Sequence, residues 1–199
     1  MNNKTTLLII VIIIFGIKSE AQVPANFTDA RDSKQYKSVK IGTQTWMAEN
    51  LAFKAGSGCY AYGNDEKNVK SYGYMYTWET SRKVCPAGWH LPSSDEWTTM
   101  LTFLGGKSVA GDKIKEAGTE HWQKPVSPST NVSGFTALPG GYRNESGEYY
   151  VLGYNGWWWC SNEEEKERAY HILIFGHVKD VTISYINKID GFSVRCVKD

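Results

Sequence analysis

The part of the sequence that decides the fold is residues 85–97, which read CPAGWHLPSSDEW. Ser93 and Glu96 have the spacing of a capping box, in which a serine hydroxyl and a glutamate carboxylate each bind a free backbone N–H at a helix start. The apolar residues that follow recur at i, i+3, i+4 and i+7 and so share one helical face: Trp97, Met100, Leu101 and Leu104. Gly105-Gly106 favours the end of the helix. The sequence therefore predicts a capped helix between Ser93 and Gly105.

Upstream of this helix, the pattern predicts a hairpin and a second helix. Tyr36 to Ile41 and Gln44 to Met47 are β-prone and flank the turn Gly42-Thr43, which is typical of a hairpin. Tyr74 to Val84 is compatible with a helix that stops before Cys85-Pro86, because the residue before proline avoids helical geometry.

The second half of the chain changes to short β-prone segments bounded by Gly, Asn or Pro. They are 135–138, 142–143, 148–151, 157–161, 169–174, 178–184 and 192–197. Hairpin-length spacings between them predict a largely antiparallel sheet. Two helices in the first half and a sheet in the second indicate an α+β fold. We expect a single domain over residues 36–199, preceded by a flexible lead-in over residues 22–35.

The N-terminus has the order of a secretory signal peptide. Lys4 is followed by an apolar run from Leu7 to Ile17 and then by Ser19-Glu20-Ala21, with small residues at the positions that a signal peptidase reads. The run is shorter than the roughly 20 apolar residues that span a bilayer. We expect a signal peptide over residues 1–21 and a protein that is secreted or held on the outer surface of a bacterium. No membrane span is expected after cleavage, and the lack of a cysteine at the cleavage point disfavours a lipid anchor.

The composition excludes several classes of partner and cofactor. With 22 basic and 21 acidic residues, the chain lacks the basic field that nucleic acid binding requires. The four cysteines form no CxxC pair and the four histidines are not spaced like metal ligands, so we expect no metal and no cofactor. An even number of cysteines in an exported chain indicates two disulfides, with three possible connectivities.

Several stretches together resemble the Fibrobacter succinogenes major paralogous domain family of exported bacterial proteins. They lie in order along the chain at 40–51, 72–73, 76–79, 85–92, 95–97, 134–135, 137–143, 157–158 and 191–197. The resemblance implies a disulfide-stapled, C-type-lectin-like fold, and the family has no settled biochemical activity. It also implies a disulfide between Cys85 and Cys196, and by elimination Cys59 and Cys160 are then left as the second pair. The shorter link Cys59–Cys85, which leaves Cys160 beside Cys196, is the alternative.

A more distant likeness leads to the formylglycine-generating sulfatase-modifying domains, which share that fold. Residues 90–97 and Gly191-Phe192 are similar to segments of those oxidases, which use a close pair of cysteines late in the chain. Here the late cysteines, Cys160 and Cys196, are far apart in sequence. The Glu-Pro-Asn and Trp-Asn-Asp motifs of calcium-dependent lectins and the Gly-x-Ser-x-Gly nucleophile elbow do not occur either. A shared fold does not transfer activity, so these features favour a binding module over an enzyme.

Trp157-Trp158-Trp159 is the stretch most suggestive of ligand binding. In a strand, Trp158 points away from its two neighbours, so one side is core. The other side is either buried as well or forms an aromatic surface on which a sugar or peptide would stack. Tyrosine, asparagine and arginine near this stretch suit adaptable recognition. The candidate ligand-binding residues are Tyr142, Arg143, Tyr149, Asn155, Trp158, Asn162 and Tyr170.

We therefore expect a secreted or surface-exposed, non-catalytic recognition module that binds a glycan, a peptide or a surface protein. The alternatives are a structural or assembly component of an exported surface complex and an unrecognised enzyme. An exposed aromatic platform would favour recognition, and a long unpaired edge strand would favour assembly. A buried pair of carboxylates in a cleft would favour an enzyme.

Overall fold

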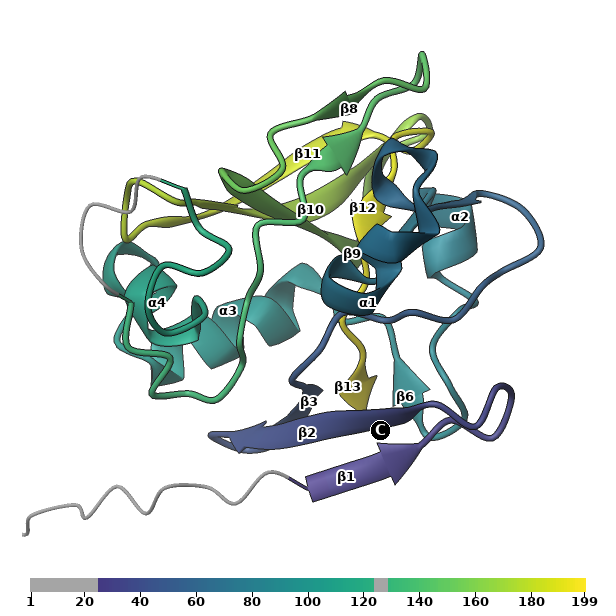
Figure 1. Cartoon of the computed structure of the whole chain (residues 1–199). Helices are drawn as coiled ribbons and strands as arrows, with labels where there is room; N and C mark the ends of the chain where they lie inside the picture. The colour runs from purple at the N-terminus through teal and green to yellow at the C-terminus, as the bar shows by residue number, and fades with distance from the viewer. Residues whose placement is uncertain (1–24, 124–128) are drawn as a thin grey trace, which may run out of the picture.

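Figure 1 shows the computed structural model of the chain, which describes residues 25–123 and 129–199. The expected signal peptide, residues 1–21, lies outside the described residues. The described part is a mixed α+β structure in which most of the regular structure belongs to two sheets. None of the helices in the described ranges is long and apolar enough to cross a membrane.

The first sheet, called here the terminal sheet, brings the two ends of the described chain together. Its strands, in spatial order, are β1 (Ala25–Thr28), β2 (Gln35–Ile41), β3 (Gln44–Met47), β13 (Val197–Lys198) and β6 (Trp89–His90). The predicted hairpin is confirmed as β2 and β3, which pair antiparallel around Gly42. Gly42 has a φ of 61°, which glycine adopts at little cost. The last strand, β13, inserts between β3 and β6, so the C-terminus completes a sheet that the N-terminus begins.

The second sheet, called here the central sheet, carries the strands of the second half. Its strands, in spatial order, are β11 (Val181–Asn187), β10 (Arg168–Phe175), β9 (Asn155–Glu165), β12 (Phe192–Ser193), β5 (Met75–Tyr76) and β4 (Cys59–Tyr60). All pairings in it are antiparallel except that of β12 with β9, so the prediction of a largely antiparallel sheet is confirmed. A separate two-stranded hairpin is formed by β7 (Tyr142–Arg143) and β8 (Tyr149–Tyr150).

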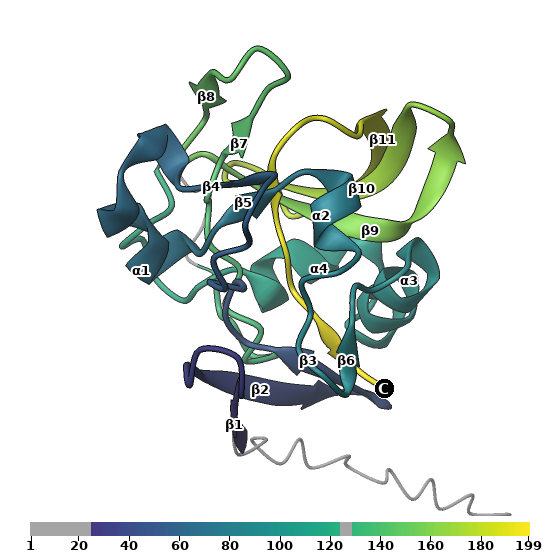
Figure 2. The same ribbon diagram turned by 90° about the vertical axis from the view of Figure 1, so that its right-hand side faces the viewer.

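The capped helix is confirmed as α3 (Ser94–Phe103). Glu96 N donates to Ser93 Oγ at 3.2 Å, and Ser93 N donates to the Glu96 carboxylate at 2.7 Å, which completes the capping box. A further helix that the sequence did not predict, α4 (Lys107–Ile114), follows after the glycine pair. The remaining helical elements are short: η1 (Tyr62–Asn64), η2 (Glu66–Asn68), α1 (Val69–Tyr72) and α2 (Trp78–Ser81). Figures 1 and 2 show α3 and α4 on one side of the central sheet and the β7–β8 hairpin on the other.

The predicted helix over residues 74–84 is wrong in its first part. Met75 and Tyr76 form β5 instead, paired on one side with β4 and on the other with β12, and only Trp78–Ser81 is helical. Both β5 side chains are buried. Pairing on two sides and complete burial outweigh the weak helix propensity of this segment.

The predicted flexible lead-in, residues 22–35, contains an ordered strand. Within it, the ring of Phe27 on β1 stacks on Trp89 with centroids 4.3 Å apart. Just after β1, the buried Asp29 carboxylate accepts a hydrogen bond of 2.6 Å from Arg31, which also donates to Val84 O at 2.8 Å. These contacts tie residues 25–31 to the domain.

Strand β9 divides the interior into two apolar layers. Trp158 and Cys160 point into a layer shared with α3 and α4, called here the helix-side core. Trp159 points into the opposite layer together with Phe192 and Trp78. Trp158 and Trp159 have no exposed surface. The Trp158 face of the stretch is therefore buried, and the opposite face is buried at Trp159 and partly exposed at Trp157.

The cysteines form one disulfide in the described residues, and the second predicted pair is wrong. Cys85 and Cys196 are bonded, with Cα atoms 5.9 Å apart. Cys59 and Cys160 are both free thiols. They lie on β4 and β9, and two strands of the central sheet separate them. Three strand spacings place their Cα atoms at about 14 Å, and a disulfide cannot bridge more than about 7 Å.

Candidate functional site

The β7–β8 hairpin presents a group of tyrosines on the side of the central sheet away from α3. Tyr142 stacks on Tyr150 with ring centroids 5.5 Å apart, because the two residues are directly opposite each other in the hairpin. Tyr149 packs on Tyr62 at 5.2 Å, and the guanidinium of Arg143 lies 4.0 Å from the centre of the Tyr60 ring. We call this group the tyrosine surface; it consists of Tyr60, Tyr62, Tyr142, Tyr149 and Tyr150.

Two hydrogen bonds, one to η1 and one within the hairpin, hold the rings of Tyr149 and Tyr150 in place. Tyr149 Oη donates to Asn64 Oδ1 at 2.8 Å, and Tyr150 Oη donates to the Glu148 carboxylate at 2.8 Å. The turn closes at Gly147, whose φ of 88° lies in the left-handed region that glycine adopts at little cost. The rings are thus presented by a short, internally bonded hairpin.

The chain leaves the hairpin through a strained residue. Val151 has a φ of 55°, a conformation that costs a β-branched residue on the order of 1–3 kcal/mol. Its carbonyl accepts hydrogen bonds from the N–H groups of Tyr154 and Asn155, at 3.0 and 3.1 Å. These two bonds fix the connection between β8 and β9, and with it the position of the tyrosine surface.

Beneath the tyrosine surface lies a layer of rings with unsatisfied polar atoms. Trp157 packs under Tyr142 at 4.9 Å and stacks on His171 at 5.0 Å. Among the described residues, neither Trp157 Nε1 nor His171 Nδ1 has a hydrogen-bond partner. Burial lowers the pKa of His171 to about 4, so its imidazole is neutral at physiological pH. The layer beneath the tyrosine surface is therefore uncharged at physiological pH.

The charged groups at this surface are of both signs. Burial, helped by the nearby Glu145 carboxylate, raises the pKa of Asp190 to about 6. Arg143 opposes that shift and also covers the Tyr60 ring. Aromatic faces beside an arginine and carboxylates suit a ligand with both apolar faces and hydrogen-bonding groups, such as a sugar or a peptide.

The structure brings four of the seven predicted ligand residues together. Tyr142, Arg143 and Tyr149 belong to the hairpin, and Asn155 starts β9 at its base, where its carbonyl accepts from Gly141 N at 2.9 Å. Tyr60, Tyr62 and Tyr150 were not among the predicted residues. Tyr60 and Tyr62 lie in the segment around Cys59, far from the hairpin in sequence, and no local pattern linked them to it.

The other three predicted residues lie elsewhere. Trp158 is a core residue with no exposed surface, which corrects its assignment to a ligand surface. Asn162 is occupied by the start of α3, since its side chain accepts from Ser94 N and donates to Ser94 Oγ, both at 2.9 Å. Tyr170 packs against the helix-side core, on the opposite face of the central sheet from Tyr142.

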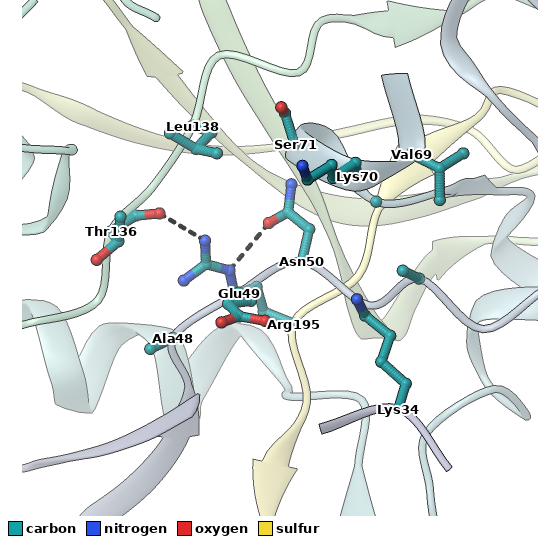
Figure 3. Close-up of a pocket in the computed structure, with 12 residues that line it drawn as sticks. Lys34, Ala48, Glu49, Asn50, Val69, Lys70, Ser71, Thr136, Leu138 and Arg195 are labelled. Atoms are coloured by element: carbon teal, nitrogen blue, oxygen red, sulfur yellow. Dashed lines mark hydrogen bonds between the residues drawn. The ribbon is translucent and has the colours of Figure 1, made fainter. Parts of the chain in front are cut away.

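A buried polar network lies between the two sheets, close to a small cavity (Figure 3). Asn50 Oδ1 accepts hydrogen bonds from Trp158 Nε1 and from Arg195 Nε, each at 2.9 Å. Asn50 Nδ2 donates to Tyr72 O at 2.8 Å and to Ser193 Oγ at 3.3 Å. Asn50, Trp158 and Arg195 all belong to stretches that carry the family resemblance. Their shared role in this structure is to join the two sheets.

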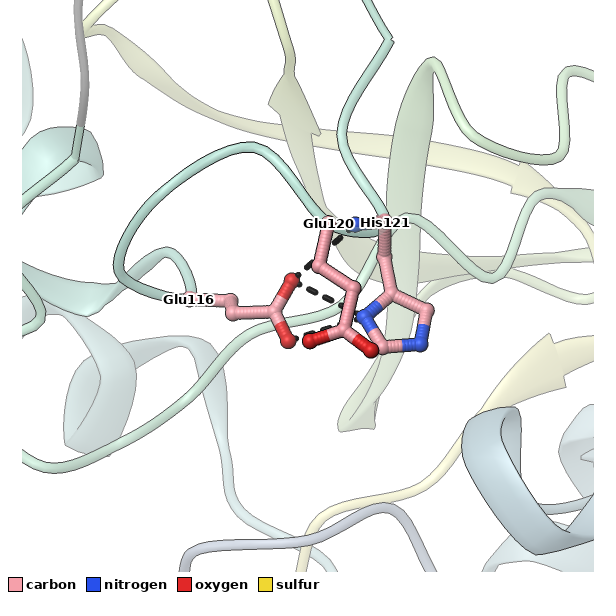
Figure 4. A group of neighbouring side chains, drawn as sticks. All are labelled: Glu116, Glu120 and His121. Atoms are coloured by element: carbon pink, nitrogen blue, oxygen red, sulfur yellow. Dashed lines mark hydrogen bonds and ion pairs between the residues drawn. The ribbon is translucent and has the colours of Figure 1, made fainter.

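Glu116, Glu120 and His121 form a group whose potential metal-ligand atoms lie within 4.8 Å of one another (Figure 4). The spacing of the histidines alone did not reveal it, because two of its members are glutamates. The Glu116 carboxylate already accepts from His121 Nδ1 at 2.8 Å and from His121 N at 3.3 Å. These bonds close the turn between the two residues, so the group has a structural role, and we assign no function to it.

The family comparison covers most of the chain. The model of the Fibrobacter succinogenes major domain matches residues 39–198, a range that contains the central sheet, the β7–β8 hairpin and the disulfide. No curated protein and no solved structure matches the chain. Since the family model covers most of its length, the chain belongs to the Fibrobacter succinogenes major domain family.

Proposed function

We propose that this protein is a secreted or surface-exposed, non-catalytic recognition module that binds a glycan, a peptide or a surface protein through the tyrosine surface. The observation that carries the proposal is the convergence of five tyrosines from two distant segments, with Arg143 among them. Tyrosine rings offer large contact areas with few rotatable bonds, which limits the entropy lost on binding. The role requires no metal and no cofactor.

Export is part of the proposal. The signal peptide expected at residues 1–21 would deliver the chain to an oxidising compartment, and the Cys85–Cys196 disulfide is compatible with such a compartment. The C-type-lectin-like fold is also proposed here. It is supported by the terminal sheet, in which strands from both ends of the chain pair near that disulfide.

A glycan array followed by variant titration tests the proposal. The purified protein is screened on the array and on a peptide library, and the affinity for any ligand found is measured for Tyr149→Ala and Tyr150→Ala. Removal of a ring that anchors a ligand costs more than about 1 kcal/mol, so each variant should weaken binding by at least about fivefold.

Tyr185→Ala provides a matched control. Tyr185 is 41% exposed, close to the 39% of Tyr150, but it lies on β11 and contacts Tyr170 on the helix-side face. The control should keep its affinity within twofold. Equal losses in Tyr150→Ala and Tyr185→Ala, or a ligand whose binding ignores the tyrosine surface, would contradict the proposed site.

A second candidate function, assembly into a surface complex, is favoured by strand β11. This strand is an edge of the central sheet, is seven residues long and contains no charged residue or proline. Natural edge strands usually carry such residues to prevent pairing with other chains. Thr182→Lys places a charge at an exposed position of this edge and should abolish any concentration-dependent self-association detected by sedimentation. A protein that is monomeric at all concentrations would remove the support for this candidate.

A further inference from the structure

A cavity of about 90 Å³ lies between the terminal sheet and α1 (Figure 3). The residues of its lining that matter for charge come from separate parts of the chain: Lys34 before β2, Glu49 beside Asn50 after β3, and Lys70 on α1. Arg195 closes it from the C-terminal segment. The volume is several times the roughly 10–15 Å³ that one water requires, so it suffices for a small polyatomic ion.

The guanidinium of Arg195 is a buried positive charge without an anionic partner. Its side chain is completely buried and donates only to neutral oxygens: Nε to Asn50 Oδ1 at 2.9 Å, Nη2 to Thr136 O at 2.7 Å, and Nη1 to Phe135 O and Met47 O. It forms no ion pair with any carboxylate in residues 25–123 or 129–199. Buried charges in proteins are normally paired, so this arrangement calls for a compensating anion.

The nearby charges give the cavity a net positive balance. Lys34 and Lys70 line it and make no ion pair within the described ranges, and Figure 3 shows Lys34 extending toward Asn50. Glu49 is the single acidic residue of the lining, and it is close enough to raise the pKa of Arg195. Burial acts more strongly in the other direction and lowers that pKa to about 9. Three cationic side chains against one carboxylate leave a surplus of two positive charges.

We propose that this cavity is a binding site for a small oxyanion, carried as a carboxylate or phosphate group, beside Arg195 and between Lys34 and Lys70. The anion accepts from the two ammonium groups at the cavity wall and from the remaining N–H of Arg195 Nη2. Such charge-assisted hydrogen bonds are about twice as strong as neutral ones. The site is separate from the tyrosine surface, so the proposal stands or falls independently of the proposed function.

Nuclear magnetic resonance on the purified protein tests the proposal with acetate and phosphate as probes, each titrated at constant ionic strength against chloride. Two N–H signals report on the site: Arg195 Nε–H, and the indole N–H of Trp158, which donates to the same Asn50 oxygen. A saturable shift of both signals is expected with at least one probe. A response to acetate alone identifies a carboxylate site, and a response to phosphate alone identifies a phosphate site.

Variants separate this site from general anion effects. The double variant Lys34→Gln, Lys70→Gln should weaken binding at least tenfold, whereas Lys83→Gln, Lys107→Gln removes the same charge from exposed positions elsewhere and should change it less than twofold. Glu49→Gln removes the opposing charge and should tighten binding. The proposal is overturned if neither probe shifts Arg195 Nε–H saturably, or if the two double variants respond alike.

Discussion

Replacing Asn50 by alanine tests whether the network between the two sheets is a main source of stability. Asn50 is 6% exposed, and its side chain makes four hydrogen bonds, to Trp158, Arg195, Tyr72 and Ser193. Alanine removes both the acceptor and the donor. The indole N–H of Trp158 and the Nε–H of Arg195 then lose their acceptor inside the protein, beside the cavity that Asn50 lines.

The size of the expected stability loss follows from the number of buried donors that are left without an acceptor. A buried donor without a partner costs about 1–3 kcal/mol, and a charged one costs more. Two stranded donors, one of them on a guanidinium, give an expected loss of about 4 kcal/mol in the free energy of unfolding. That is a large fraction of the roughly 5–15 kcal/mol that stabilises a domain.

Urea denaturation followed by tryptophan fluorescence measures this loss. Asn68→Ala is the matched control, because Asn68 has an ordinary helical φ of −69° and its partly exposed side chain donates one hydrogen bond of 3.0 Å, to Tyr62 O. The control should lose less than about 1 kcal/mol, as surface substitutions usually do. A loss below about 1.5 kcal/mol for Asn50→Ala would show that water replaces the lost partners and that the network contributes little.

Four further predictions concern the cysteines, pH and metal ions. Removing the Cys85–Cys196 bond, which links residues 111 positions apart, should cost about 5 kcal/mol in the same denaturation assay; a cost below about 2 kcal/mol would contradict the chain-entropy estimate. In denaturant without reductant, a thiol reagent should label both Cys59 and Cys160. In the folded protein both thiols should react slowly, because burial raises their pKa, to about 11 for Cys59. If no free thiol is detected after unfolding, the two cysteines form a second disulfide. Burial raises the pKa of Asp190 to about 6, so its contribution to the free energy of unfolding is most favourable below about pH 4 and is lost as the pH rises through 6. Asp190→Asn should therefore raise the melting temperature at pH 7. A variant whose melting temperature depends on pH as that of the unaltered protein does would refute this. Chelation with EDTA should leave the melting temperature unchanged, and a fall of many degrees would show that a bound metal ion stabilises the protein, with Glu116, Glu120 and His121 in Figure 4 as the ligands to test first.

Local signals in the sequence predicted the elements that depend on local interactions. The capping box and apolar face of α3 and the β2–β3 hairpin are specified within about a dozen residues, and both are present. Residues 74–76 failed as a helix because their conformation is set by β4 and β12, which lie at least 14 positions away in sequence. The order of strands in a sheet of that kind is not encoded in any local pattern.

The candidate site shows the same limit. The sequence pointed to Tyr142, Arg143 and Tyr149 because they surround the tryptophan stretch, and the structure groups them. Tyr60 and Tyr62 join them from more than 80 positions away, which only the folded chain reveals. Asn162 is near the others in sequence, but its side chain accepts a hydrogen bond from Ser94 N at the start of α3.

The many aromatic residues have two roles: most tryptophans fill the core, and several tyrosines lie on the β7–β8 hairpin. Six of the eight tryptophans are fully buried, and four of those donate their indole N–H to a fixed oxygen on another segment: Trp78 to Cys160 O, Trp122 to Ala137 O, Trp158 to Asn50 Oδ1 and Trp159 to Tyr76 O. Each such tryptophan fills a large volume and also fixes the register between segments that have few apolar aliphatic residues between them. Tyrosines instead supply the rings of the β7–β8 hairpin, where a hydroxyl can remain in water. Replacing Tyr149 or Tyr150 should therefore disturb the core less than replacing a buried tryptophan, whereas Tyr142 also packs on Trp157 and Phe192. On the proposed function, ligand specificity would reside in the hairpin and in the segment around Tyr60, whereas Trp158 and Trp159 of the tryptophan stretch belong to the buried scaffold.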